Sequence, residues 1–244
     1  MFSGKKVLIT GGSKGIGLAI AKKFVKENAR VVITGRNEES LKKACETIGG
    51  RGIDYTVWDI SDISKISEQF TKVVNSLGGL DILVNNAGVL TKNDYGGMFA
   101  VTPETWDYTM NINLRSVFFL SQAIAEYMRD NGVRGRIVNV CSNNAYRAKD
   151  TAYAAAKWGV RGLTAGMGKA LAPYGIIVNG VAPGPTSTTI LGVEDNSEIK
   201  YDGCVLGRYS YPDEIADVVL FLAGEQAGSI IGQTIISDGG ETLL

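Results

Sequence analysis

The feature that most constrains the fold is a short apolar run followed at once by glycines and then by an amphipathic stretch. Residues 5–10 end in Val-Leu-Ile-Thr, which is typical of a strand buried on both faces. Residues 11–17 read Gly-Gly-Ser-Lys-Gly-Ile-Gly, and apolar residues then recur at helical spacing as far as Val25. A strand, a glycine turn and a helix in this order form the first half of a βαβ unit, whose helix N-terminus presents free N–H groups to a phosphate. A turn with a purely structural role is the alternative interpretation of these glycines.

Further short apolar runs follow along the chain, separated by stretches with helical spacing. The runs that we predict to be strands are 5–10, 31–34, 53–58, 80–84, 136–142, 176–179 and 233–237. Helices are predicted near 38–48, 62–77, 102–130, 151–172 and 212–222. This alternation is typical of one doubly wound parallel sheet, a Rossmann-like α/β fold with helices on both faces. Ligands of such sheets bind at the carboxyl ends of the strands.

Residues 1–244 contain no internal repeat or low-complexity linker, so we expect a single dinucleotide-binding catalytic domain. Residues 186–207 have little hydrophobic periodicity and contain several Gly, Asp and Thr residues. We predict that this segment is a mobile substrate lid over the carboxyl edge of the sheet.

Composition excludes several kinds of partner and chemistry. Lys+Arg and Asp+Glu are equal at 25 each, so no net field attracts nucleic acid or an anionic membrane. No apolar stretch approaches the roughly 20 residues that span a bilayer, and we expect a cytoplasmic protein. Cys45, Cys141 and Cys204 lack metal-ligand spacing, which favours reduced thiols and no metal site. The absence of histidine excludes Ser-His and Cys-His pairs and leaves Tyr, Lys and carboxylates as acid/base candidates.

Tyr153 and Lys157 form the most promising acid/base pair. If their segment is helical, they stand at i and i+4 on one face, so the ammonium lies near the phenol. A nearby cation favours the phenolate, and we therefore expect the pKa of Tyr153 to be lowered from about 10 toward neutrality. A Tyr and a Lys that merely share a helix face would give the same pattern.

Cofactor choice depends on the end of the predicted strand 31–34. An acidic residue there would bind the ribose 2′-hydroxyl of NAD, whereas an arginine accommodates the 2′-phosphate of NADP. This chain has Arg36, and Lys14 in the glycine turn adds a second cation. We therefore predict NADP(H), with two solvated surface cations as the alternative interpretation.

Polar residues end three further predicted strands. Asp59, the turn Asn85-Asn86-Ala87-Gly88 and Ser142 all fall at the carboxyl edge, together with the glycine turn. Asn113 lies inside the predicted helix 102–130 beside apolar neighbours, and a buried asparagine needs hydrogen-bond partners. A local hydrogen bond within the helix and a role in the site are both open for Asn113.

Together these elements resemble the short-chain dehydrogenase/reductase family, of the compact kind with a Tyr-x-x-x-Lys pair. The resemblance extends over essentially the whole chain. The residues that carry it are Thr10-Gly11-x-x-x-Gly15-Ile16-Gly17, Asp59, Asn85-Asn86-Ala87-Gly88, Asn113, Ser142, Tyr153-x-x-x-Lys157, Pro183-Gly184 and Asp238-Gly239-Gly240.

The resemblance implies four catalytic residues. Tyr153 would be the general acid toward a ketone or the base toward an alcohol. Lys157 would lower the pKa of Tyr153 and hold the nicotinamide ribose. Ser142 would hydrogen-bond the substrate oxygen, where negative charge develops. Asn113 would help to position Lys157 and a water that passes protons to solvent.

The resemblance also implies the cofactor contacts. Those that would border the phosphates are Gly11, Ser13, Lys14, Gly15, Ile16 and Gly17. Arg36 would hold the 2′-phosphate, and Asp59 and Ile60 the adenine. The adenosine side and its ribose would contact Asn86, Ala87 and Gly88. The nicotinamide end would meet Tyr153, Lys157, Pro183 and Gly184, with Thr188 at its carboxamide and Thr186 close enough to compete.

Two features depart from the family pattern. Eleven positions separate Ser142 from Tyr153, two fewer than is usual, so the intervening loop must be tightened. That loop carries the polar residues Asn143, Asn144, Tyr146, Arg147 and Lys149. This polar set indicates a polar substrate, unless it only solvates an exposed loop.

The predicted function is interconversion of a carbonyl and a secondary alcohol by hydride transfer with NADP(H). A 3-oxoacyl thioester and a polar, sugar-like hydroxy compound are the two competing substrates. Arg129, Arg134 and Arg136 would form a basic patch for a carrier protein near the entrance, or a solvated surface. The alternatives in other classes are a dinucleotide-binding sensor without turnover and an epimerase or dehydratase acting on a nucleotide sugar. The resemblance implies a homotetramer with the helices near 102–130 and 151–172 in an interface.

Overall fold

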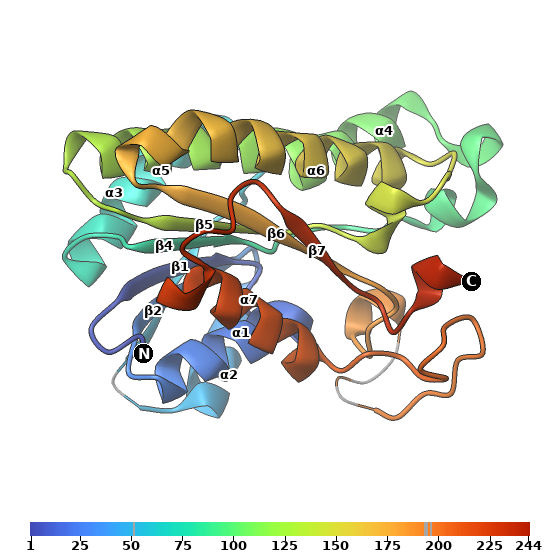
Figure 1. The fold of residues 1–244 in the computed structure, drawn as a ribbon, viewed down its shortest axis with the longest axis horizontal. Coiled ribbons are helices and arrows are strands. Elements are labelled where there is room, and N and C mark those ends of the chain that lie inside the picture. Colours follow the sequence, from blue (N-terminus) through green and yellow to red (C-terminus); the bar gives the residue numbers. More distant parts are fainter. Residues whose placement is uncertain (51, 193–194, 196) are drawn as a thin grey trace.

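The computed structural model describes residues 1–50, 52–192, 195 and 197–244 (Figure 1). These residues form one seven-stranded parallel sheet in the order β3-β2-β1-β4-β5-β6-β7. The strands are β1 (Lys6–Thr10), β2 (Arg30–Gly35), β3 (Ile53–Val57), β4 (Ile82–Asn85), β5 (Arg136–Val140), β6 (Ile177–Pro183) and β7 (Thr234–Ser237). The predicted doubly wound sheet is therefore confirmed.

Helices cover both faces of the sheet (Figure 1). One face packs against α1 (Gly15–Lys26), α2 (Glu38–Ile48) and α7 (Pro212–Ala223). The other packs against α3 (Ile66–Leu77), α5 (Ser116–Asp130) and α6 (Ala152–Leu171), with α4 (Pro103–Met110) before α5. No helix in the described part of the chain is long and apolar enough to cross a membrane.

Strand β1 shows why the apolar runs are continuous rather than alternating. Val7 and Ile9 belong to the core beneath α1 and α7, whereas Leu8 belongs to the core beneath α3 and α5. Successive side chains of a strand point to opposite faces, and both faces of this sheet are buried. The central strands are therefore apolar along most of their length, whereas the edge strand β3 is partly exposed and carries Asp54 and Thr56.

The predicted helix 102–130 is interrupted by one wide turn. Residues Asn111–Arg115 form a π-helical turn between α4 and α5. The side chain of Asn113 donates to the carbonyl of Thr109 at 3.1 Å, and such side-chain bonds compete with the regular α-helical ladder. The π turn therefore lies at a residue for which we predicted a functional role.

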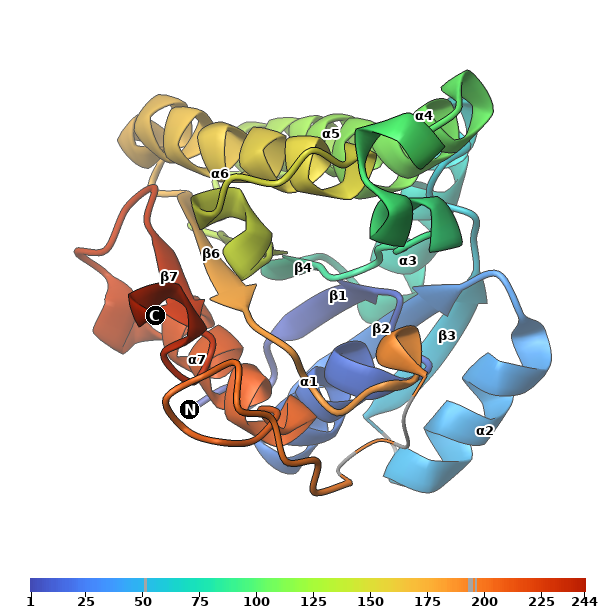
Figure 2. The same ribbon diagram turned by 90° about the vertical axis from the view of Figure 1, so that its right-hand side faces the viewer.

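The described part of the segment predicted as a lid follows β6 and lies at the carboxyl edge of the sheet. Figure 2 is turned so that this edge faces the viewer. The described part of 186–207 contains a short 3-10 turn, Thr189–Leu191, and single bridges from Thr186 to Ser210 and from Lys200 to Arg208. Residues 193, 194 and 196 of the predicted lid lie outside the described residues. Mobility of the segment stays a prediction.

Candidate active site

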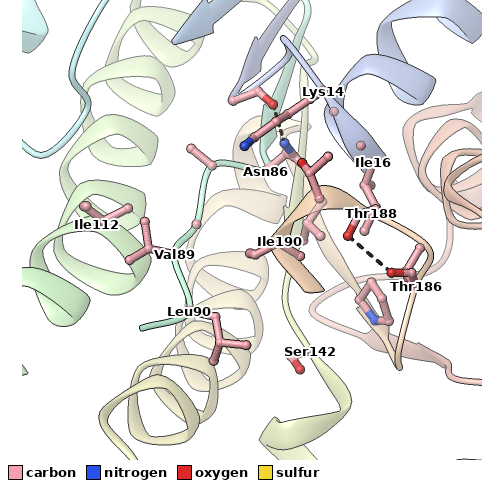
Figure 3. Close-up of a pocket in the computed structure, with 18 of the residues that line it drawn as sticks. Lys14, Ile16, Asn86, Val89, Leu90, Ile112, Ser142, Thr186, Thr188 and Ile190 are labelled. Carbon is pink, nitrogen blue, oxygen red and sulfur yellow. Dashed lines mark hydrogen bonds between the residues drawn. The ribbon is translucent and has the colours of Figure 1, made fainter. Parts of the chain in front are cut away.

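A cavity of about 500 Å³ follows the carboxyl ends of β1, β2, β4, β5 and β6. It lies where the strand order changes direction between β1 and β4, which is the ligand-binding position in doubly wound sheets. Figure 3 shows Lys14 and Ile16 toward one end and Ser142 and Leu90 toward the other. Every residue predicted above to bind cofactor lines this cavity, as do Ser142, Tyr153 and Lys157. Asn113 is the one predicted site residue that does not line it.

The glycine turn that follows β1 depends on close backbone approaches. Gly11 and Gly15 have φ angles of +65° and +55°, which favour glycine. A Cβ on Gly17 would collide with the carbonyl oxygen of Gly11 and with the side-chain nitrogen of Asn86. Asn86 in turn donates to the carbonyls of Thr10 and Gly11 at 2.9 and 3.0 Å. The two loops that the sequence placed at the same edge are thus bonded to one another.

The N-terminus of α1 is already in contact with an anion, the side chain of Asp195. The Gly15 N–H donates to the Asp195 carboxylate at 2.7 Å, and the Thr189 N–H lies 3.3 Å from the other carboxylate oxygen. This N–H is one of those predicted to face a phosphate. Sequence reasoning missed Asp195, which lies 180 positions from Gly15 and in no recognisable motif.

Tyr153 and Lys157 lie on the first two turns of α6, where the i, i+4 spacing predicted them. Thr151 caps the helix by accepting from the Ala154 N–H at 3.1 Å. The Lys157 ammonium lies 5.5 Å from the centre of the Tyr153 ring and donates to the Val140 carbonyl at 3.0 Å. The buried carboxylate of Asp94 accepts from the Tyr153 N–H at 3.1 Å, which links the loop after β4 to this helix.

The expected lowering of the Tyr153 pKa is wrong for the ligand-free protein. Desolvation raises the pKa of the phenol to about 12, although the nearby hydroxyl of Ser142 opposes the rise. Burial also lowers the pKa of Lys157, which is only 5% exposed. Lys157 hydrogen-bonds a backbone carbonyl rather than the phenol, so burial dominates over charge attraction. In the ligand-free protein the Tyr153 phenol is therefore protonated at neutral pH.

Asn113 makes the local helix hydrogen bond that the sequence left open, and it also bonds Val89, which lines the cavity; its role in the site stays a prediction. It is fully buried and donates to the carbonyl of Thr109, one turn earlier. It also accepts from the Val89 N–H at 3.0 Å and donates to the Val89 carbonyl at 2.9 Å. Asn113 thereby holds the backbone that follows the Asn-Asn-Ala-Gly turn. A Cβ on the adjoining Gly88 would lie 2.8 Å from the Asn113 oxygen and 3.7 Å from the Lys157 nitrogen.

Charged side chains gather at the opposite end of the cavity. Arg36 follows β2 and donates to the Tyr108 hydroxyl at 3.3 Å, which raises the pKa of its guanidinium. Lys14 is the N-cap residue of α1 and is exposed. The carboxylate of Asp59 accepts from the N–H and the hydroxyl of Ser61 at 3.0 and 2.7 Å. A glycine cradle and two cations at one end of a long cavity fit a dinucleotide with an additional phosphate.

A polar wall next to Ser142 is built partly from the C-terminus. Glu241 is 7% exposed, lines the cavity and forms an ion pair with Arg147. The Asn143 amide donates to Glu241 at 2.6 Å, and the Tyr201 hydroxyl donates to it at 3.1 Å. The sequence singled out Asn143 and Arg147 but gave no signal for Glu241, which lies in no periodic segment.

Most of the remaining loop residues are accounted for by structural contacts. The Tyr146 hydroxyl donates to the Thr234 carbonyl at 2.6 Å, and Lys149 is exposed.

The predicted basic patch near the entrance is wrong. Arg136 begins β5, Arg134 precedes it and Arg129 ends α5, so all three lie toward the amino end of β5, opposite the cavity.

The model of the short chain dehydrogenase family matches residues 5–198. A 3-oxoacyl-[acyl-carrier-protein] reductase of Thermotoga maritima is 39% identical, covering 97% of each chain. A gluconate 5-dehydrogenase of Gluconobacter oxydans is 32% identical, covering 99% of this chain and 96% of the relative. A 3-ketoacyl-(acyl-carrier-protein) reductase of Brucella melitensis, solved in complex with NADH, has a TM-score of 0.90 and 31% identity, covering 98% of this chain and 99% of that one. The protein belongs to the short-chain dehydrogenase/reductase family of oxidoreductases.

Proposed function

We propose that the protein is an NADP(H)-dependent oxidoreductase that interconverts a carbonyl and a secondary alcohol, with Tyr153 as the acid/base. The observation that carries this proposal is one cavity that is lined by Tyr153, Ser142, Lys157 and the glycine turn. Both Tyr153 and Lys157 are present, and no feature of the described site favours a sensor without turnover.

Each catalytic side chain has one task in this proposal. The nicotinamide supplies the hydride when it is bound. Tyr153 donates its phenolic proton to the carbonyl oxygen, and Ser142 donates a hydrogen bond to the same oxygen as negative charge develops there. Lys157 holds the ribose and stabilises the phenolate that remains. Asn113 keeps the backbone at Val89 in place through its three hydrogen bonds.

Residues of the glycine turn and the strand ends would hold the cofactor. The turn would hold the phosphates, Asp59, Ile60 and the Asn86-to-Gly88 turn would hold the adenosine, and Pro183 and Gly184 would hold the nicotinamide. Thr186 and Thr188 both line the cavity, and the Thr188 hydroxyl donates to the Thr186 carbonyl at 3.2 Å (Figure 3). Thr188 remains our choice for the carboxamide.

The preference for NADP(H) rests on Arg36 and Lys14. No acidic side chain ends β2, and Arg36, which follows this strand, is exposed and lines the cavity, where it could bind a 2′-phosphate. We expect Arg36→Ala to weaken NADP binding by roughly 10- to 100-fold, because a charge-assisted contact contributes about 1.5–3 kcal/mol, and to leave NAD binding within about twofold. Equal affinities of the parent protein for the two cofactors, measured by fluorescence titration, would refute this preference.

The proposed activity is tested by incubating the purified protein with NADPH and a panel of carbonyl compounds while following nicotinamide absorbance. The panel should contain a 3-oxoacyl thioester and several hydroxy ketones, because the named relatives include both an oxoacyl reductase and a gluconate dehydrogenase. We expect oxidation of NADPH with at least one member. Loss of absorbance with none of them, in protein shown to bind NADPH, would contradict the proposal.

A homotetramer is proposed together with this activity. Exposed aromatic side chains on α4, α5 and the start of α6 support an interface there: Trp106, Tyr108, Phe118, Phe119 and Trp158. Light scattering coupled to size exclusion tests the proposal, and a monomeric mass would reject it.

A further inference from the structure

Asn143 occupies a special position, immediately after Ser142 and at the start of the 3-10 turn Asn143–Tyr146. Its side chain is 4% exposed, and the residue lines the same cavity as Tyr153. Its amide nitrogen donates to two carboxylates, to Glu241 at 2.6 Å and to Asp238 at 3.4 Å. Both carboxylates come from the segment that follows β7.

These two carboxylates fix the orientation of the Asn143 amide. An ionised carboxylate only accepts hydrogen bonds, so the opposite orientation would set the amide oxygen against two negative groups. The nitrogen must therefore face Glu241 and Asp238. Within the described residues, no donor hydrogen-bonds the Asn143 side-chain oxygen, and this oxygen is not among the fully buried polar atoms that lack a partner, so it keeps access to the cavity that Asn143 lines. A ligand that covers this oxygen without donating a hydrogen bond would leave a buried acceptor unpaired, which is costly.

The frame that holds Asn143 is itself well connected. The guanidinium of Arg147 and the hydroxyl of Tyr201 both donate to the second oxygen of Glu241. The ion pair with Arg147 compensates the charge of a carboxylate that is almost fully buried. Asp238 is held in turn by the N–H groups of Gly240 and Thr242 at 3.0 and 2.9 Å. One free acceptor, the Asn143 side-chain oxygen, is thus held beside Ser142. The contacts that hold it come from the loop after β5, the segment after β6 and the C-terminal segment.

We propose that the Asn143 side-chain oxygen accepts a hydrogen bond from a substrate hydroxyl on the carbon next to the reacting carbonyl. This inference rests on the proposed function, in which Ser142 binds the carbonyl oxygen. The substrate class is then an α-hydroxy ketone, and its reduction product is a vicinal diol. In a 3-oxoacyl thioester, the carbons beside the reacting carbonyl bear no hydroxyl, so binding would leave the Asn143 oxygen buried and unpaired.

The test compares hydroxyacetone with butanone, which differ by a hydroxyl in place of a methyl group. With NADPH, we expect the parent protein to show kcat/KM about tenfold higher for hydroxyacetone, the effect of roughly one buried hydrogen bond. Asn143→Ala should bring the ratio close to one by lowering kcat/KM for hydroxyacetone. A merely structural role would lower both values together and leave the ratio unchanged.

Three further variants sharpen the result. Lys149→Ala, an exposed position in the same loop, is the matched control and should keep the parent ratio. Asn143→Gln keeps the amide but displaces its oxygen, so the ratio of kcat/KM for hydroxyacetone to that for butanone should fall close to one. This variant tests the inference even if Asn143→Ala fails to fold. Glu241→Gln removes the charge that orients the amide and should give an intermediate ratio.

Two results would overturn the inference: equal kcat/KM for the two ketones in the parent protein, or a parent ratio that persists in folded Asn143→Ala or Asn143→Gln. Either result leaves the proposed function standing, because butanone or another carbonyl would still be reduced. Failure of the parent protein to reduce any carbonyl in the panel would instead reject the proposed function.

Discussion

The contact between Asp195 and the N-terminus of α1 makes a specific prediction about cofactor affinity. The Gly15 N–H donates to the Asp195 carboxylate at 2.7 Å, and it is one of the groups that we assign to the cofactor phosphates. A phosphate that takes this N–H must displace the carboxylate, whose negative charge also repels it. Replacing Asp195 by Asn should therefore tighten cofactor binding.

The size of the effect follows from the contact that is lost. A hydrogen bond to a charged group contributes about 1.5–3 kcal/mol, against about 0.5–1.5 kcal/mol for a neutral one. Asp195→Asn keeps a neutral acceptor, so the competing contact should weaken by about 1 kcal/mol, which is roughly a fivefold lower Kd. The gain should shrink at high salt, because part of it is charge repulsion between partly exposed groups.

Fluorescence titration of NADP in the parent protein and in Asp195→Asn measures this difference. Asp202→Asn is the matched control, since Asp202 is an exposed carboxylate in the same part of the chain. Its Kd should equal that of the parent protein. An unchanged or weaker affinity in Asp195→Asn would refute the reasoning that this carboxylate and the cofactor compete for one N–H.

Two more predictions follow from the site. Gly17→Ala should abolish detectable cofactor binding and lower the melting temperature, because its methyl group would displace both the Gly11 carbonyl and Asn86. Gly162→Ala is the control for both measurements, since a Cβ at that position meets open space. In the ligand-free protein, desolvation raises the Tyr153 pKa to about 12, so the ultraviolet difference spectrum between the parent protein and Tyr153→Phe should show no phenolate from this residue up to about pH 10. A phenolate signal from Tyr153 near neutral pH in the ligand-free protein would show that charge attraction outweighs desolvation.

Local patterns in the sequence were sufficient to predict the sheet and the cofactor edge. The apolar runs are continuous because both faces of the sheet are buried, and the glycine turn is recognisable because Gly17 must approach Gly11 closely. Tyr153 and Lys157 share a helix face by spacing alone. Each of these features depends on residues that are near neighbours along the chain, so periodicity and turn chemistry reveal them.

Features that depend on distant residues could not be predicted in this way. Asp195 lies 180 positions from Gly15, and Glu241 lies 98 positions from Asn143, so no local pattern connects them. The direction of the Tyr153 pKa shift was wrong for a related reason. The i, i+4 spacing reveals the nearby ammonium, but the desolvation that outweighs it arises from the packing of the whole cavity. The hydrogen bond between Asn113 and Val89, 24 positions earlier, likewise leaves no local pattern in the sequence.

The central claim is that Tyr153 transfers the proton in an NADP(H)-dependent carbonyl reduction. Its most direct test is single-turnover oxidation of bound NADPH by Tyr153→Phe, which removes one hydroxyl and keeps the ring. We predict a rate lower by about 10²–10⁴-fold, the usual contribution of a positioned general acid, with the Kd for NADPH within about twofold of the parent value. Undiminished turnover in this variant would contradict the account.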